Sequence, residues 1–380
     1  MQETVAELYN PAVSFRDFYG NHEVVTRLRE MLARDRFPHA VILAGPEGSG
    51  KYMLAQMVAK AMNCLQPTES DGLPDYCGVC SNCTRIAQAD DLAARFAEAV
   101  EAREALRETD KKETRILVQT HPEVMVIPPD PPQMLIKIGQ VHRVIQTIYY
   151  KPAEARRRVY IFTESGFMKE AANSLLKVLE EPPEFATLFL LAENVGTLLP
   201  TIRSRCITFT LGALSAREIE EVLAARRPEW NVRQRMLVAR LSGGAVGKAL
   251  SFDIAAYAAA RKDALTLLNS AINENDHSEL FRTTESYRAG AEGREKTGQL
   301  IRATYSVLED LLFLKSDSQP LVRNTDVLPE LTRMAQAVDF EWIERAAQGL
   351  GKVESGMRRN LLRSLALDSF AAGLELGRER

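Results

Sequence analysis

The segment GPEGSGKYM, residues 45–53, constrains the fold of this chain more than any other part of its sequence. Its glycines and its lysine match a phosphate-binding loop, in which backbone amides and a lysine ammonium surround an anion. The apolar run 40–44 precedes the loop, and the helical pattern 53–64 follows it. Such a loop requires this order of strand, loop and helix, because the loop amides and the helix N-terminus must point at one anion. The candidate anion-binding residues are Gly45, Gly48, Gly50 and Lys51.

Apolar runs of strand length recur along the first part of the chain, at 123–127, 158–162 and 187–193. They alternate with helical patterns such as 21–36 and 138–149. Strands that alternate with helices indicate a parallel sheet joined by crossover helices. The predicted fold class of this part is therefore α/β, with a parallel sheet and a phosphate-binding loop.

The sequence changes character after about Leu211, beyond which every pattern is helical. Ser215 and Glu218 form a capping box at the start of one of these helices. The charged, alanine-rich stretch 84–118 is expected to be a helical insert without a chemical role. We expect three domains: an α/β domain over residues 1–212, a small helical domain over 213–253 and an all-α domain over 254–380.

Four of the five cysteines lie close together in the sequence. Cys64 is followed by twelve residues and then by CGVCSNC, residues 77–83. Four thiolates that reach one point suit tetrahedral Zn²⁺ with a closed coordination shell, so we expect a structural site that leaves out Cys206. A ferredoxin-type iron–sulfur cluster would need a further Cys and a Pro within residues 84–88, which supply neither. The predicted zinc ligands are Cys64, Cys77, Cys80 and Cys83.

The bulk composition is that of a globular protein and argues against several function classes. A net charge of −3 gives no global positive field with which to grip nucleic acid. No apolar run reaches the roughly 18–20 residues that span a bilayer, and the first 15 residues lack a signal-peptide core. We therefore expect a cytoplasmic protein with reduced thiols.

Two positions of the loop site lack the groups that hold Mg²⁺. Tyr52 stands where the loop motif has Ser or Thr, whose hydroxyl ligates the ion. Thr163 stands where an acidic residue is expected after the strand 158–162, although Glu164 follows. Two losses that serve the same ion argue that ATP hydrolysis is absent and that no Mg²⁺ is bound. Whether the loop glycines and Lys51 still bind a phosphate or ATP, or only turn the chain, stays open.

Further segments carry a family resemblance. They are FRDFYGNHEVVTRL near the start, HPEVMVI from residue 121, AANSLLKVLEEPP at 171–183 and TIRSRC at 201–206, together with the loop and the cysteines. These segments resemble the AAA+ clamp-loader subunits of bacterial DNA polymerase III, and within that family most closely the delta-prime subfamily. The resemblance runs from about Phe15 to Leu250. It implies a lid role for the domain 213–253 and an oligomerising collar for 254–380.

Departures from the family pattern bear on activity. Motor subunits of the family have a Ser or Thr at position 52, an Asp at 163 and a sensor Arg in the second domain, where Gly247 falls in this chain. The delta-prime subfamily is implied to be a rigid stator that does not turn over ATP. The resemblance thus implies a part of the DNA polymerase III holoenzyme without ATPase or polymerase activity of its own. An active AAA+ motor subunit is the alternative.

The resemblance also implies a role for the motif Ser204-Arg205-Cys206. In the family this Arg reaches into the ATP site of a neighbouring subunit as an arginine finger, where a guanidinium stabilises transition-state charge. From the residues alone, Arg205 is only a surface cation. The implied partners are the gamma/tau motor subunits and delta, with the sliding clamp and primer–template DNA engaged through the complex. A direct DNA-binding module that uses the zinc site and residues 156–158 is a further alternative.

Overall fold

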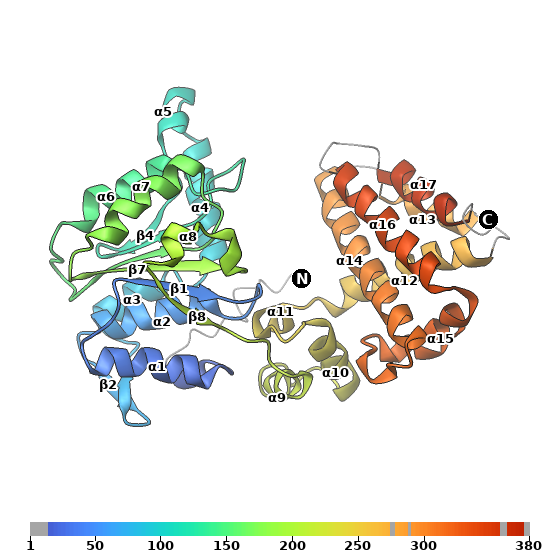
Figure 1. The fold of residues 1–380 in the computed structure, drawn as a ribbon, viewed down its shortest axis with the longest axis horizontal. Helices are drawn as coiled ribbons and strands as arrows, with labels where there is room; N and C mark the ends of the chain where they lie inside the picture. The colour runs from blue at the N-terminus through green and yellow to red at the C-terminus, as the bar shows by residue number, and fades with distance from the viewer. Residues whose placement is uncertain (1–13, 274–277, 288–289, 358–362, 376–380) are drawn as a thin grey trace. The chain divides into compact units, whose positions relative to one another are not determined.

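The computed structural model of the protein describes residues 14–273, 278–287, 290–357 and 363–375 (Figure 1). The expectation about a signal peptide therefore falls almost wholly outside the described residues. The chain forms two compact units. The first runs to Arg226 and includes Gly243–Ser251, and the second comprises Arg227–Ser242 and the chain from Phe252.

A six-stranded sheet lies at the centre of the first unit, in the order β4-β5-β6-β7-β1-β8. Its strands from β5 to β8 are parallel, as predicted, and β4 pairs antiparallel with β5 at one edge. The strands are β1 (Ala40–Ala44), β4 (Val118–His121), β5 (Val124–Ile127), β6 (Arg158–Phe162), β7 (Ala186–Ala192) and β8 (Ile207–Thr210).

The sequence did not predict the two edge strands, and their burial explains why. In β8 only Phe209 is buried, so the strand presents no apolar run. In β4 the two terminal residues, Val118 and His121, are buried and the middle of the strand is not. By contrast all residues of β1 and β7 are buried, because helices cover both faces of the sheet there.

Helices pack on both faces of the sheet, with α6 and α7 on one side and α1 and α2 on the other (Figure 1). Val41 and Leu43 of β1 join the core beneath α1 and α2, whereas Ile42 joins the core beneath α6 and α7. This alternation follows from the two-residue period of a strand. The helices of this unit are α1 (His22–Ala33), α2 (Lys51–Asn63), α3 (Ser81–Ala87), α4 (Leu92–Glu104), α5 (Glu108–Glu113), α6 (Ile138–Ile148), α7 (Lys169–Glu180), α8 (Pro200–Arg203), α9 (Ala216–Arg226) and α11 (Val246–Leu250).

The parallel strands bring three connections to one edge of the sheet. Ala44 of β1 lies opposite Ala192 of β7, and Phe162 of β6 lies opposite Leu190 of β7. The loops that follow β1, β6 and β7 therefore emerge side by side. This is the edge at which an open α/β sheet places its ligands.

The charged stretch predicted as an insert forms α4 and α5, and it is anchored rather than wholly solvated. Arg103 of α4 is buried, and its Nη1 donates to Asp130 Oδ1 at 2.7 Å. Asp130 is also buried and accepts from Lys137 Nζ at 3.0 Å and from the Ile116 amide at 3.2 Å. One carboxylate thus ties the insert to the segment before α6.

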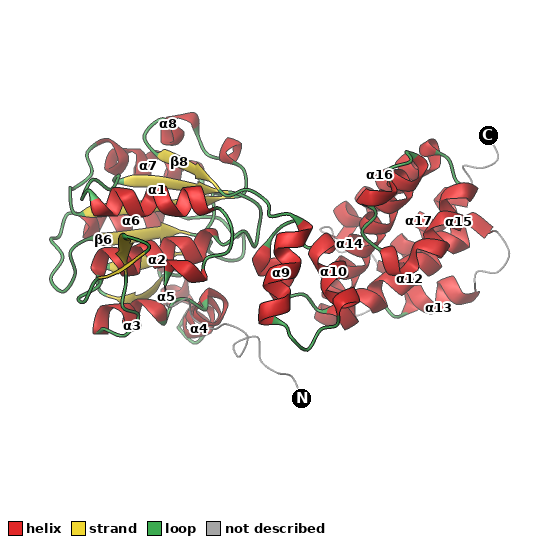
Figure 2. Ribbon diagram, turned by 90° about the horizontal axis from the view of Figure 1, so that it is seen from below, coloured by secondary structure: helices red, strands yellow, loops and turns green. Residues whose placement is uncertain are grey.

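The secondary-structure elements described in the second unit are all helices, as predicted for the chain beyond Leu211 (Figure 2). Its helices are α10 (Val232–Leu241), α12 (Ile254–Asn273), α13 (Ser278–Glu285), α14 (Gly290–Lys315), α15 (Leu328–Ala337), α16 (Phe340–Met357) and α17 (Arg363–Glu375). The helices from α12 onward enclose one hydrophobic core that includes Leu268, Leu311 and Trp342. None of the helices in the described ranges combines the length and the hydropathy that crossing a bilayer would need.

Candidate functional site

The candidate phosphate-binding loop connects β1 to α2 at the edge of the sheet where the loops after β6 and β7 also emerge. Its three glycines adopt positive φ angles, and all three are also approached too closely to carry a side chain. A Cβ at Gly50 would lie 2.8 Å from the ring of Phe18, and one at Gly48 would lie 2.9 Å from the Lys248 amide nitrogen. Gly45, Gly48 and Gly50 lie in the loop between β1 and α2, and Lys51 is the first residue of α2.

Lys51 is turned onto the carbonyls of its own loop. Its Nζ donates to the Gly45 oxygen at 2.6 Å and to the Pro46 oxygen at 2.8 Å. Burial lowers the pKa of Lys51, and the charges of Glu193, Glu164 and Glu47 oppose that shift. The ammonium is therefore surrounded by oxygen atoms of the protein.

The residue after this lysine points away from the loop. The hydroxyl of Tyr52 donates to the main-chain oxygen of Ala89, 2.5 Å away, and accepts from Gln56 Nε2 at 2.6 Å. Ala89 lies in the turn after α3. The phenol thus joins α2 to that turn, and it offers no short alcohol at the start of α2.

The neighbouring strand ends supply carboxylates in place of an Asp at position 163. Glu164 follows β6 and Glu193 follows β7 at the same edge. Partial burial raises the pKa of Glu164, and the charge of Glu193 raises it further, whereas Lys51 lowers it. Sequence reasoning missed Glu193, because only the pairing of β6 with β7 brings the ends of these two strands together.

The short helix α11 packs directly on the loop within the first unit. The Gly247 amide donates to the Gly48 oxygen at 2.8 Å, and Lys248 Nζ lies 3.1 Å from Glu47 Oε2. A Cβ at position 247 would lie 3.0 Å from the Gly48 oxygen and 3.1 Å from its Cα. Any side chain at 247 would therefore press against the loop.

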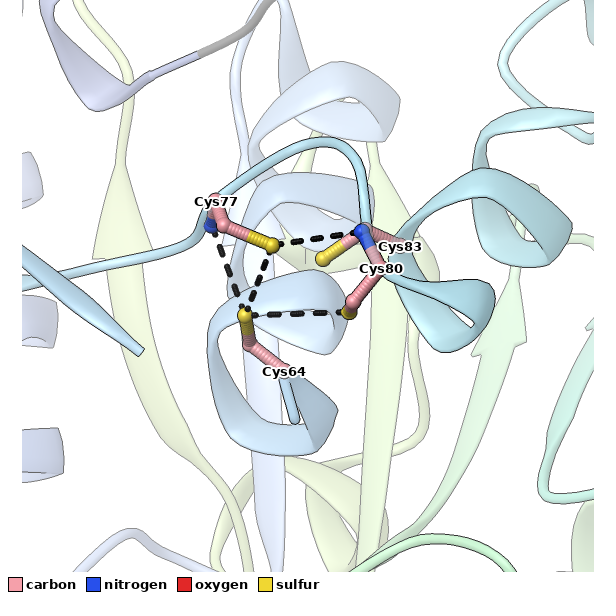
Figure 3. Close-up of side chains that lie close together, drawn as sticks. All are labelled: Cys64, Cys77, Cys80 and Cys83. Atoms are coloured by element: carbon pink, nitrogen blue, oxygen red, sulfur yellow. Dashed lines mark hydrogen bonds between the residues drawn. The ribbon is translucent and has the colours of Figure 1, made fainter. Parts of the chain in front are cut away.

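The four predicted metal ligands form one cluster (Figure 3). Their sulfur atoms all lie within 4.8 Å of one another, and Cys64 Sγ is 3.5 Å from Cys77 Sγ and 3.9 Å from Cys80 Sγ. A tetrahedron with Zn–S bonds of about 2.3 Å has sulfur atoms about 3.8 Å apart. Main-chain amides of Leu65, Cys77 and Cys80 point at these sulfurs, as suits thiolates. The four cysteines can therefore hold a metal ion such as zinc.

Cys206 stays apart from this cluster, as expected. It is partly buried against the core beneath α6 and α7, and burial raises the pKa of its thiol to about 12.

Three elements supply the cysteines. Cys64 caps the C-terminus of α2, Cys77 and Cys80 lie in the loop that precedes α3, and Cys83 lies within α3. Asn82, beside Cys83, is buried and donates to the main-chain oxygens of Asn63 and Glu154 at 3.0 and 3.1 Å. These bonds fix the cluster against the α/β core.

A small hairpin of β2 (Thr68–Ser70) and β3 (Leu73–Asp75) fills the sequence between Cys64 and Cys77. Buried Arg29 of α1 donates to the oxygens of Pro74 and Leu73 at 3.0 and 2.9 Å. Asp75, also buried, accepts from Ser14 Oγ at 2.6 Å and from the Phe15 amide at 3.3 Å. The hairpin is thus docked on α1 and on residues 14–15 by polar groups that no local pattern revealed.

A second buried ionic contact links α2 to the chain after α3. Lys60 Nζ lies 2.5 Å from Asp90 Oδ2, and both residues are buried. The signal for it was a lysine inside the apolar helical pattern MVAKAMN, which indicates a charge facing the interior.

Arg205 lies at the end of the short segment that follows α8. Its Nη2 donates to Glu180 Oε1 at 2.7 Å, and its Nη1 donates to the Thr201 oxygen at 2.9 Å. About a third of its side chain, 34%, is exposed. The guanidinium therefore lies at the surface of the first unit, beside the end of the LLKVLEE helix.

Two of the three arginines at 156–158 contact groups of this chain. Arg157 Nη2 lies 3.2 Å from Asp35 Oδ1, and Arg158 Nε donates to the Tyr150 oxygen at 2.5 Å. Arg156 is exposed. The stretch therefore does not offer three free cations to a nucleic acid.

Comparison with known proteins gives one family match and a set of relatives. Residues 20–215 match the family model described as "DNA polymerase III, delta subunit". The chain is 30% identical over 254 residues to DNA polymerase III subunit tau of Escherichia coli (strain K12), which is 66% of this chain and 34% of that protein. It is 29% identical over 210 residues to DNA polymerase III subunit gamma of Buchnera aphidicola subsp. Acyrthosiphon pisum, which is 55% of this chain and 48% of that protein. The chain thus spans less than half the length of these relatives.

Two solved structures align with most of the chain at low TM-scores. A DNA polymerase III gamma subunit-related protein from Thermotoga maritima aligns at a TM-score of 0.40 and 17% identity, over 94% of this chain and 99% of that chain. The DNA clamp loader delta protein of Bacillus subtilis aligns at a TM-score of 0.29 and 12% identity, over 92% of this chain and 99% of that chain.

Proposed function

The chain belongs to the DNA polymerase III, delta subunit, family, and on that premise we propose that it is a non-hydrolysing stator subunit, of the delta-prime type, in a clamp loader. In this role it helps a multi-subunit machine open a sliding clamp and place it on primed DNA. It works in the cytoplasm, beside gamma/tau motor subunits and delta. The clamp and the primer–template DNA meet it through the complex.

The observation that carries this proposal is the direction of Tyr52. Its hydroxyl is bound to the Ala89 oxygen, so the first turn of α2 gives Mg²⁺ no alcohol ligand. Without a held divalent cation, the charge that develops on a transferring phosphoryl group is not neutralised. The chain therefore does not hydrolyse ATP, although Gly45, Gly48, Gly50 and Lys51 keep the frame of an anion site.

Two further positions support the same function. Thr163 replaces the acidic residue that would hold the hydration shell of Mg²⁺. Gly247 replaces the sensor Arg, and a Cβ atom at this position would press against the main chain of Gly48. Lys51, meanwhile, is satisfied by the oxygens of its own loop. Each feature lowers the affinity for a Mg²⁺-bound triphosphate.

The chemical contribution of this subunit is Arg205, supplied in trans. A guanidinium at the surface of the first unit, on a segment packed against the core, suits insertion into the ATP site of a neighbouring motor subunit. In this arrangement residues 1–212 form the AAA+ domain, 213–253 the lid and 254–380 the collar that assembles the subunits.

The cysteine cluster serves this function as a structural element. Cys64, Cys77, Cys80 and Cys83 hold Zn²⁺, which closes the loop between α2 and α3 and has no open coordination position for catalysis.

Turnover by the isolated chain tests the stator function. We expect purified protein with Mg²⁺, ATP and primed DNA to show no hydrolysis above background. In a complex with motor subunits, the variant Arg205→Ala should assemble normally and lower the rate of ATP hydrolysis at the neighbouring motor site by about 10³-fold, as arginine fingers do elsewhere. ATP hydrolysis by the isolated chain at the pace of a motor would contradict the proposal.

An active motor subunit is the second candidate function. It is favoured by the complete set of loop glycines, by Lys51 and by Glu164 at the adjacent strand end. The relatives named tau and gamma point the same way. The turnover measurement separates the two candidates, because only a motor hydrolyses ATP without partners.

A further inference from the structure

Arg205 is held by groups from two different motifs of the first unit. Its Nη2 donates to Glu180 Oε1 at 2.7 Å, and its Nη1 donates to the main-chain oxygen of Thr201 at 2.9 Å. Glu180 is the last residue of α7, and Thr201 lies in α8. The guanidinium is therefore fixed from two sides by its own chain.

The elements that carry the pair share one core. Leu179, next to Glu180, and Ile202 of α8 are buried in the same hydrophobic cluster beneath α6 and α7. Cys206, next to Arg205, packs against that cluster. The separation between the carboxylate and the guanidinium is thus set by packed side chains rather than by mobile loops.

A contribution to the stability of the fold does not explain the ion pair between Glu180 and Arg205. The two side chains are 34% and 51% exposed, and ion pairs at that exposure contribute little to folding. Glu180 also lies at the C-terminus of α7, where the helix dipole disfavours a carboxylate. A residue placed against a local preference, with a defined partner, indicates a functional position.

We propose that Glu180 is the positioning residue for the arginine finger. This inference rests on the proposed function, because Arg205 must meet a nucleotide held by a neighbouring subunit. Glu180 accepts a hydrogen bond from Nη2 of Arg205. The Nε–H of Arg205 makes no hydrogen bond among the described residues. A guanidinium carries five N–H donors in a rigid fork, so one edge stays available for phosphate oxygens while another is held.

A mutant cycle in the assembled complex tests this role. This chain is combined with the motor and delta subunits of its own organism, with sliding clamp and primed DNA, and ATP hydrolysis is measured for the variants Glu180→Ala, Arg205→Ala and the double variant. We expect Glu180→Ala to lower kcat by about 10- to 100-fold, the cost of a misplaced reacting group, with a smaller change in KM. The double variant should match Arg205→Ala alone, because Glu180 acts through Arg205.

Two further variants serve as controls. Glu181→Ala removes the same charge one residue later, where the described residues show no ion pair to Arg205, and it should leave the rate unchanged. Glu180→Gln keeps the length of the side chain and a neutral acceptor, so it should retain part of the rate. The mass of the complex shows whether Glu180→Ala assembles. If it does not, the rate measured for Glu180→Gln tests the positioning role instead.

The outcomes separate this inference from the function on which it rests. If Arg205→Ala leaves hydrolysis unchanged, the supply of an arginine in trans is wrong. If Arg205→Ala lowers the rate but Glu180→Ala leaves it unchanged or raises it, only the positioning role is overturned. A further loss caused by Glu180→Ala in the Arg205→Ala background overturns it as well, because Glu180 would then act without Arg205.

Discussion

The hydroxyl of Tyr52 donates a hydrogen bond to the main-chain oxygen of Ala89, 2.5 Å away. Tyr52, Gln56 and Lys60 follow one another at four-residue intervals, so they lie along one face of α2. Gln56 donates to the Tyr52 hydroxyl, and Lys60 pairs with Asp90, the residue after Ala89. This polar face joins the phosphate-binding loop, at the start of α2, to the segment that follows the cysteine cluster. The tyrosine therefore has a structural role that is separate from the proposed loss of a Mg²⁺ ligand at this position.

The variant Tyr52→Phe tests that structural role. It removes the hydroxyl and leaves the Ala89 oxygen and the Gln56 amide without their partner, which should cost about 1–3 kcal/mol. We expect a fall of several degrees in the melting temperature of the first unit, measured by calorimetry. An unchanged transition would show that the bond to Ala89 contributes nothing.

The variant Tyr52→Ser asks whether one hydroxyl restores activity. It places an alcohol at the position where the loop motif has one, but Thr163 still provides no carboxylate for the ion. We expect no ATPase activity from the isolated variant and a less stable first unit, because the bond to Ala89 is lost. Turnover by this single variant would mean that Glu164 alone can hold the ion.

Metal content tests the cysteine cluster. We expect about one Zn²⁺ per chain, released when the thiols are titrated with a mercurial reagent. Cys64→Ser should lose the metal and lower the melting temperature of the first unit by roughly 10 °C, because metal binding is linked to folding. Cys206→Ser is the matched control and should retain the full complement. Protein purified without metal that unfolds at the same temperature as the metal-loaded form would refute a structural role.

The lowered pKa of His121 predicts that the stability of the first unit depends on pH. Its Nδ1 accepts from the Glu123 amide at 3.2 Å, so that nitrogen carries no proton in the folded state. Burial lowers the pKa of His121, and the neighbouring charge of Arg85 lowers it further. Between this lowered pKa and the ordinary value of about 6.5 the unfolded chain binds more protons, so stability rises with pH in that window.

Acidification should therefore destabilise the first unit as the pH falls below about 6.5, and the loss is complete below the folded-state pKa of His121. His121→Gln, which does not titrate, should show a shallower slope between pH 5 and 6.5 in chemical unfolding. Equal slopes in the two proteins would assign the acid sensitivity to other groups.

The contact between Gly247 and Gly48 can be tested by adding one methyl group. In Gly247→Ala the new Cβ would lie 3.0 Å from the Gly48 oxygen, closer than ordinary packing allows. We expect a loss of about 1–3 kcal/mol in the stability of the first unit, as for other overpacked sites. Gly373→Ala, in α17, should be neutral or slightly stabilising, because no atom of the described residues lies within 4 Å of the added Cβ. A stable Gly247→Ala variant would mean that α11 is free to move off the loop.

Local sequence patterns by themselves determined the central strands, the phosphate-binding loop and the cysteine cluster. The run at 40–44, the glycines with Lys51, and the spacing from Cys64 to Cys83 each lie within a short stretch of chain. Backbone freedom, period and ligand spacing act over such distances, so the sequence is enough to predict them.

The tertiary structure alone decided which distant groups meet. Edge strand β8, the approach of Gly247 to Gly48 and the pairing of Arg205 with Glu180 left no mark in any local pattern, and the buried position of Lys60 did not reveal Asp90 as its partner. Each depends on how crossover helices bring separate segments to one place, and a polar side chain acquires its partner only there. The sequence therefore proposed the candidate site residues, and the packed fold decided what each of them touches.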